Sequence, residues 1–284
     1  MYTSLTKAVE GNCSLGLVCG WVSDHWELFN NGVALNLDIK NVNFLDPAII
    51  GMTLHVNRHF NGMMGFINAN QDTQKIIDRV NGRINPGTIF PAFPIGSALD
   101  GELLIRFNHW VKLVLTRYYN TSRKADSSKV QIAAVELINN IIDHSQAHKG
   151  GIIVGASFKR RKHFEITVID FGKSIPGTLE EQFPGRSDAE IITSALEFGV
   201  SRRKGSEHNY GRGLDLVKQY ALQDKQCSLQ IISRKGFVSI TNAELPHVRA
   251  SKYEFPGTVV KCCFSEAFVL EDIEEYASSE ELEY

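Results

Sequence analysis

The chain has 284 residues, of which 43% are hydrophobic and 22% are charged, and its formal net charge is −2. This composition supports a packed core and excludes a disordered chain, and the length allows one large domain or two of ordinary size. The small net charge excludes a general electrostatic attraction to nucleic acid.

The sequence carries no pattern that would direct it into a membrane. Residues 1–12 lack the basic segment and apolar run of an export signal, and no apolar run approaches the length that spans a bilayer. The five cysteines form neither a paired metal spacing nor an even disulfide set. Adjacent Cys262 and Cys263 would point to opposite sides of a strand, as small apolar residues. We therefore expect a cytoplasmic protein without membrane or direct nucleic-acid partners.

The first part of the chain alternates short apolar runs with helical patterns. Residues 16–22 and 33–38 suit two strands. Pro47 is well placed to open a helix, whose apolar residues recur at near-helical spacing. A short strand over 64–68 and an amphipathic helix over 71–80 follow. This β-β-α-β-α order predicts a small α/β unit.

The densest cluster of glycine and proline lies between residues 81 and 101 and predicts a domain boundary. We expect an α/β domain over residues 1–85, a linker over 86–100, a second domain over 101–268 and an acidic tail over 269–284. In the second domain the patterns predict helices over 102–119, 128–144, 189–198 and 214–222, and strands over 152–158, 164–169, 229–233, 238–242 and 258–264.

A polar set lies within the apolar helix that follows Ser128. Asn140, Asp143 and His144 follow Glu136 by four, seven and eight residues. The four side chains therefore share roughly one helix face. Burying a carboxylate beside isoleucine and leucine is costly unless something polar binds there. This set therefore predicts a binding site, although capping or packing would also account for Asp143 and His144.

Two glycine turns follow this helix at useful distances. The segment Asp170-Phe171-Gly172-Lys173-Ser174-Ile175 ends a buried strand, and Gly211-Arg212-Gly213-Leu214 opens a helix. Glycine lets the backbone pass close to a ligand, and free N–H groups at a helix start hold phosphate. Together with the polar helix, these turns predict a nucleotide pocket.

The order of these parts resembles the ATP-binding domains of the GHKL superfamily, which includes histidine kinases, anti-sigma factors and gyrase-type ATPases. Four motifs carry the resemblance: Glu136 and Asn140 in the first box, Asp170 and Gly172 in the second, Gly211 and Gly213 in the third, and Pro256-Gly257-Thr258 at the turn into the last core strand. The resemblance covers residues 101–264. It implies a Bergerat-type α/β sandwich with a mixed sheet that binds ATP and Mg²⁺.

The residues suit the roles that this resemblance implies. Asn140 offers a neutral oxygen to Mg²⁺, and Glu136 would orient a water or a substrate hydroxyl toward the terminal phosphate. Asp170 would accept a hydrogen bond from the adenine amino group, and Gly211 and Gly213 would approach the phosphates. The remaining residues expected to contact the nucleotide are Asp143, His144, Gly172, Lys173, Ile175, Arg202, Arg212, Leu214 and Thr258.

Two residues depart from the family pattern. Ser174 stands where a second glycine is common in the adenine loop, and Asp215 stands where the phosphate loop often has glycine. A carboxylate near phosphates repels them unless it turns away or meets a cation such as Lys173 or Arg212. The departures leave nucleotide binding expected but turnover open.

Two further patterns are Leu35-Asn36-Leu37-Asp38 and Val42-Asn43-Phe44-Leu45-Asp46, the second followed by the helix that Pro47 opens. On these patterns the segment over residues 33–82 resembles a STAS-type domain, the fold of anti-sigma-factor antagonists. In phosphorylated antagonists the helix after Asp46 begins with serine or threonine, whereas here Pro47 and Ala48 follow. Without a hydroxyl at that place, the resemblance implies a docking or regulatory surface rather than a phosphorylated switch.

The combined resemblances favour a regulatory ATP/Mg²⁺-binding protein of the anti-sigma serine/threonine kinase type, with a protein partner and a possible homodimer. A histidine kinase core is an alternative, but His109 is followed by Trp110 and Val111 rather than by the usual acidic residue and proline. A conformational ATPase would carry a transducer domain after the pocket. A non-catalytic, nucleotide-gated adaptor also stays open, so enzymatic activity is undecided.

Overall fold

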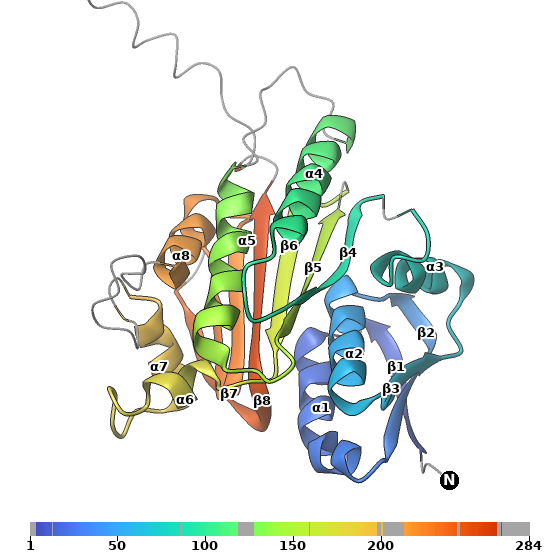
Figure 1. The fold of residues 1–284 in the computed structure, drawn as a ribbon, viewed down its shortest axis with the longest axis horizontal. Helices are drawn as coiled ribbons and strands as arrows, with labels where there is room; N and C mark the ends of the chain where they lie inside the picture. Colours follow the sequence, from blue (N-terminus) through green and yellow to red (C-terminus); the bar gives the residue numbers. More distant parts are fainter. Residues whose placement is uncertain are drawn as a thin grey trace, which may run out of the picture.

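The structure is a computed structural model, and it describes residues 4–12, 14–85, 87–118, 128–158, 160–197, 200, 213–242, 245–265 and 268. Two sheets organise this part of the chain: a three-stranded sheet in the order β1-β2-β3 and a five-stranded sheet in the order β4-β5-β6-β8-β7. Helices pack on both, as Figure 1 shows. The expected α/β class is confirmed.

The N-terminal unit alternates strands with helices. Its elements are β1 (Ser4–Asn12), α1 (Leu15–Asn30), β2 (Ala34–Phe44), α2 (Pro47–Phe60), β3 (Met64–Ile67) and α3 (Gln71–Val80). Both strand pairs are parallel, so each connection must cross over the sheet, and a helix does so each time. The positions of α2 and α3 agree with the predicted helices, and the Asp46 carboxylate caps α2 by accepting a hydrogen bond from the N–H of Ala48 at 2.8 Å.

The prediction of a strand over residues 16–22 was wrong, because these residues lie in α1. Ser14 caps this helix, with its hydroxyl oxygen accepting a hydrogen bond from the N–H of Leu17. Val18, Val22 and Phe29 are buried at helical spacing. A short apolar run fits a strand or a buried helix segment equally well. Strand β1, which precedes the helix, was not predicted.

The five-stranded sheet consists of β4 (Ile89–Ile95), β5 (Gly151–Phe158), β6 (His163–Asp170), β7 (Ser228–Ile240) and β8 (His247–Ser265). We expected a mixed sheet, but every described pair in it is antiparallel. Residues 86–100, expected to be a linker, contain β4, which pairs with β5 at the edge of this sheet. The two short strands predicted over 229–233 and 238–242 form one strand, with an irregular register beside Arg234, whose φ is 48°.

One face of the five-stranded sheet is covered by helices from the second half of the chain. These are α4 (Gly101–Tyr118), α5 (Ser128–Asn140), which continues into the π-helix η1 (Ile141–Ser145), and α8 (Gly213–Gln223). Helices α6 (Ile175–Leu179) and α7 (Asp188–Ala195) lie at one end of the sheet (Figure 1). Among the described residues, none of the helices is both long and apolar enough to cross a membrane.

The other face of this sheet is covered by α1 and α2, which therefore lie between the two sheets (Figure 1). Gly51 of α2 approaches β5 so closely that a Cβ there would lie 3.1 Å from a methyl group of Val154. One core cluster joins buried residues of the N-terminal unit, such as Ile49, with Val154 and Phe255 of the large sheet. The N-terminal unit thus shares its core with the second half of the chain.

Candidate functional site

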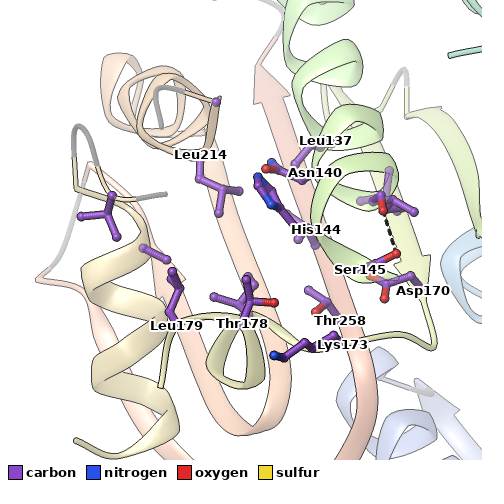
Figure 2. Close-up of a pocket in the computed structure, with 17 residues that line it drawn as sticks. Leu137, Asn140, His144, Ser145, Asp170, Lys173, Thr178, Leu179, Leu214 and Thr258 are labelled. Atoms are coloured by element: carbon purple, nitrogen blue, oxygen red, sulfur yellow. Dashed lines mark hydrogen bonds between the residues drawn. The ribbon is translucent and has the colours of Figure 1, made fainter. Parts of the chain in front are cut away.

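A cavity lies between the end of α5, the start of α8, helix α6 and strands β6 and β8 (Figure 2). Its lining comprises Leu137, Asn140, Ile141, His144, Ser145, Val168, Asp170, Lys173, Ile175, Thr178, Leu179, Ala195, Val200, Gly213, Leu214, Thr258 and Val260. Its volume is about 90 Å³, whereas pockets for ligands of drug size have about 300–1,000 Å³. The cavity that the described residues enclose is therefore smaller than such a pocket.

Asp170 is the most buried charged group of this lining, with 4% of its surface exposed at the end of β6. Burial raises the pKa of its carboxyl group to about 7, although a hydrogen bond from the N–H of Gly172 at 2.9 Å opposes the shift. A carboxyl group held in an apolar cavity at this cost is a candidate acceptor for a ligand donor.

Two glycines allow the backbone to close around Asp170. A Cβ at Gly257 would lie 2.0 Å from the carbonyl oxygen of Asp170, and a Cβ at Gly172 would lie 2.2 Å from that of Ser145. Any other residue at these positions would force backbone segments apart. The glycines of two predicted motifs therefore serve close approach between elements.

A hydroxyl network joins three elements beside the cavity. The Ser233 hydroxyl of β7 donates a hydrogen bond to the carbonyl of Gly257 at 3.0 Å and accepts one from the N–H of Ile175 at 3.1 Å. The Thr258 hydroxyl lies 2.9 Å from the hydroxyl oxygen of Ser233. This network ties the start of α6 to the β7–β8 pair, and so fixes Thr258 in the lining.

The junction of α5 and η1 places further polar groups at the cavity. The N–H of Lys173 donates a hydrogen bond to the carbonyl of Ser145, which joins the end of η1 to the loop after β6. The amide nitrogen of Asn140 and the hydroxyl oxygen of Thr178 are buried and have no hydrogen-bond partner among the described residues. Leaving such atoms unpaired costs about 1–3 kcal/mol each, and a polar ligand in the cavity would offset that cost.

The structure brings together most of the residues that the sequence singled out. Asn140, His144, Asp170, Lys173, Ile175, Gly213, Leu214 and Thr258 line the cavity, and Figure 2 shows Asn140 and His144 on one side with Asp170 and Thr258 on the other. Gly172 and Asp143 lie outside this lining, and Gly172 lines a separate hollow together with Ser174 and Pro256. Arg202, Gly211 and Arg212 lie outside the described residues.

Glu136 lies one turn before Asn140 on α5 and does not belong to the lining of the cavity. It is half-buried, and burial raises the pKa of its carboxyl group. Its side chain lies against the first residue of α8, because a Cβ at Gly213 would be 2.5 Å from Oε2 of Glu136. Glu136 is therefore beside the helix start at which a phosphate would be held.

The two departures from the family pattern have local roles. Asp215 is 6% exposed and faces its own helix: Gln219 donates a hydrogen bond to its carboxylate at 2.8 Å, and the Lys218 ammonium lies 3.5 Å away. Its charge is thus balanced by Lys218 on the same helix, whereas Arg212 lies outside the described residues. Ser174 caps α6, and its hydroxyl accepts a hydrogen bond from the N–H of Gly177 at 3.1 Å.

Helix α6 contributes lining residues that the sequence had not indicated, namely Thr178 and Leu179. A signal for this helix exists, because a serine cap followed by proline in the first turn is typical of a helix start. No local signal marks Ser233, whose role depends on a strand that meets the loop only in the folded protein.

Comparison with known families agrees with this geometry. Residues 100–223 match the family described as "Histidine kinase-like ATPase domain". No curated protein matches the chain. The ATPase-like segment runs from α4 through α8 and includes Asn140 and Asp170. The match supports a GHKL-type ATPase domain, a type that binds ATP with Mg²⁺. It does not extend over the N-terminal unit, whose likeness to a STAS domain stays a prediction.

Proposed function

We propose that this chain is an ATP- and Mg²⁺-binding regulatory protein that resembles anti-sigma-type serine/threonine kinases and binds a protein partner in a nucleotide-dependent way. The observation that carries the proposal is the cavity in the ATPase-like segment, where the buried carboxyl group of Asp170 lies opposite the unpaired amide nitrogen of Asn140.

The base would bind at the Asp170 end of the cavity. A carboxylate oxygen accepts a hydrogen bond from the exocyclic amino group of adenine. Guanine presents a carbonyl oxygen at the equivalent place, and two acceptor oxygens repel each other. The apolar side chains of Val168, Ile175 and Leu179 also line the cavity and suit the faces of a flat ring. The site should therefore prefer ATP over GTP.

The phosphates would extend toward the start of α8. Backbone N–H groups at the beginning of this helix, from Gly213 onward, suit an anion. Bound Mg²⁺ neutralises phosphate charge, and the side-chain oxygen of Asn140 would hold it as one of few protein ligands. Lys173, which lines the same cavity, adds a positive charge.

Binding is tested by titration calorimetry with the full chain. Mg²⁺-ATP should bind and GTP should bind at least about tenfold more weakly. Asp170→Asn should weaken ATP binding by about 100-fold, because the amide presents a donor to the adenine amino group. The matched control is Asp215→Asn, which changes a buried carboxylate that faces its own helix. Equal ATP affinity in the Asp170 variant and the wild type would overturn the site.

The role of the metal is tested with Asn140→Ala. This variant should lose the Mg²⁺ dependence of ATP binding, since it lacks the oxygen that we assign to the metal. A variant whose ATP affinity still rises with Mg²⁺ as in the wild type would rule out Asn140 as the ligand.

The proposal also includes the transfer of a phosphoryl group to serine or threonine of a protein partner. Labelled ATP incubated with the protein and a cell extract, followed by phosphosite mapping, should reveal serine or threonine acceptors. Glu136→Ala should retain ATP binding and lose transfer, because Glu136 lies beside the start of α8. If the wild type binds ATP but transfers or hydrolyses nothing with any partner, the protein is a nucleotide-gated adaptor.

A further inference from the structure

Three residues with metal-binding side chains meet on the face of the large sheet that is turned away from the cavity. His163 and Glu165 lie two residues apart on β6, and Cys263 lies opposite Glu165 on β8. The imidazole Nε2 of His163 is 3.0 Å from Oε1 of Glu165, and the Cys263 sulfur is 3.7 Å from the same oxygen. All three ligand atoms lie within 4.8 Å of one another.

These separations are close to those around a tetrahedral zinc ion. With bonds of about 2.0–2.3 Å to nitrogen, oxygen and sulfur, tetrahedral ligands lie about 3.3–3.7 Å apart. The sulfur–oxygen distance of 3.7 Å lies at the upper end of this range, and the nitrogen–oxygen distance of 3.0 Å, set by a hydrogen bond, must lengthen slightly for an ion to enter. The donor set of imidazole, carboxylate and thiol suits Zn²⁺ rather than Mg²⁺ or Ca²⁺, which take oxygen ligands.

The charges around the three side chains also favour a cation. The Lys261 ammonium lies 2.7 Å from Oε2 of Glu165 and 2.7 Å from a carboxylate oxygen of Asp46. Two carboxylates therefore face one ammonium, which leaves one negative charge. Lys261 occupies Oε2 of Glu165 and leaves Oε1 for His163 and Cys263, as a residue that orients a metal ligand would do.

The site is shielded but reachable from solvent. The side chains of His163 and Glu165 are 13% and 11% exposed, and Cys263 is half-buried. The ring of Phe158 lies 5.1 Å from that of His163 and covers it on one side. Neighbouring Cys262 is buried in the core under the helices of the opposite face, so only one of the two adjacent thiols belongs to the cluster.

We propose that His163, Glu165 and Cys263 bind one Zn²⁺ through Nε2, Oε1 and Sγ, with water as the fourth ligand. On binding, the hydrogen bonds of His163 and Cys263 to Glu165 break. The imidazole proton moves from Nε2 to Nδ1 through solvent, which frees the Nε2 lone pair for the metal, and the thiol proton of Cys263 passes to solvent as the sulfur–zinc bond forms. The ion joins β6 to β8 next to Asp46, the cap of α2.

The site is tested by titrating the full chain, after removal of metal by a chelator, with Co²⁺ as a spectroscopic probe and then with Zn²⁺. The wild type should bind one Co²⁺ per chain with a thiolate charge-transfer band in the near ultraviolet, and one equivalent of Zn²⁺ should abolish that band. Zn²⁺ should also raise the melting temperature by a few degrees. Absence of the charge-transfer band would overturn the proposal.

Variants locate the metal. Cys263→Ser should abolish the band, whereas the matched control Cys262→Ala, one residue along the same strand, should retain it. Because Cys263→Ser removes a largely buried thiol, His163→Gln provides a second variant and should weaken Zn²⁺ binding at least tenfold. A band that persists in Cys263→Ser, or unchanged Zn²⁺ affinity in His163→Gln, would show adventitious binding elsewhere.

Alkylation gives an independent readout. Zn²⁺ should slow the reaction of Cys263 with iodoacetamide in the wild type, as mapped by mass spectrometry, and should not slow it in His163→Gln. Equal protection in both proteins would contradict the assigned ligands. ATP affinity, measured with and without Zn²⁺, should stay the same because the cluster lies on the other face of the sheet.

Discussion

The two faces of the large sheet differ in what surrounds their buried, unpaired polar atoms. On the face under α5 and α8, the unpaired amide nitrogen of Asn140 and hydroxyl of Thr178 border a cavity. On the face under α1 and α2, both ring nitrogens of His55 lack a hydrogen-bond partner among the described residues, but the ring stacks on Phe171 at 4.4 Å. Burial lowers the pKa of His55 to about 3, so it stays neutral. Unpaired buried atoms indicate a ligand only where space for one exists.

The two faces meet at the loop that follows β6. Asp170 lines the cavity, while the next residue, Phe171, points to the other side and packs against Trp26 at 4.9 Å and His55 at 4.4 Å. The N-terminal unit therefore packs against the back of the loop that we propose to hold the adenine. This arrangement would let a partner that moves α1 or α2 change nucleotide affinity.

On the face under α5 and α8, the largest expected effect is a change in the stability of the protein on Asp170→Asn. The carboxyl pKa is about 3.8 without the protein environment and about 7 in the fold. Between these values the folded state binds a proton that the unfolded state has lost, so the free energy of unfolding falls as pH rises from 4 to 7. Above pH 7 the ionised carboxylate costs up to about 4 kcal/mol, at about 1.4 kcal/mol per pKa unit.

Asp170→Asn should therefore be more stable than the wild type at pH 8, while binding ATP more weakly. Denaturant unfolding at pH 5 and pH 8 measures this, and the gain should shrink at the lower pH. If the variant is less stable than the wild type at pH 8, the contacts of the Asp170 carboxylate stabilise the fold by more than its burial costs.

On the opposite face, a larger side chain at the contact between α2 and β5 tests the comparison. Gly51→Leu should destabilise the protein by about 1–3 kcal/mol, because its side chain would enter a packed core beside Val154. Since the two halves share that core, calorimetry should show one transition that shifts as a whole.

Gly16→Ala is the control for this substitution, because a Cβ at Gly16 meets no atom within 4 Å, and it should leave the melting temperature within about 2 °C. Two separate transitions in Gly51→Leu, with only one of them shifted, would mean that the halves fold independently.

A smaller effect is expected where the faces meet. Phe171→Leu removes ring contacts with the N-terminal unit and leaves Asp170 in place, so ATP affinity should fall about fivefold because the loop after β6 would be held less firmly. Phe158→Leu, which removes a ring contact with Phe44 away from this loop, should leave ATP affinity unchanged. Similar ATP affinity in both variants would separate the N-terminal unit from nucleotide binding.

Sequence patterns predicted those parts whose signals are local. Pro47 and the apolar spacing after it predicted α2, and the isolated polar residues Asn140 and Asp170 stood out from apolar surroundings. Contacts made across elements were not predictable, as with Ser233 and Thr178. The cover of the large sheet by α2 does have a signal in the sequence: residues 47–53 include no charged side chain. All seven are buried in the fold, as expected for a helix between two layers.

The smallest expected effect concerns Ser174, which stands where related loops often have glycine. Its hydroxyl caps α6, the helix that carries Thr178 and Leu179 into the cavity. Ser174→Ala should cost about 1 kcal/mol of stability, whereas Ser174→Gly should cost only a few tenths, because glycine is a tolerable cap. Since a frayed α6 would loosen one wall of the cavity, ATP affinity should fall about twofold in the alanine variant and hold in the glycine variant. Unfolding and calorimetry measure the two effects, and equal ATP affinity in both variants would mean that the cap of α6 does not shape the site.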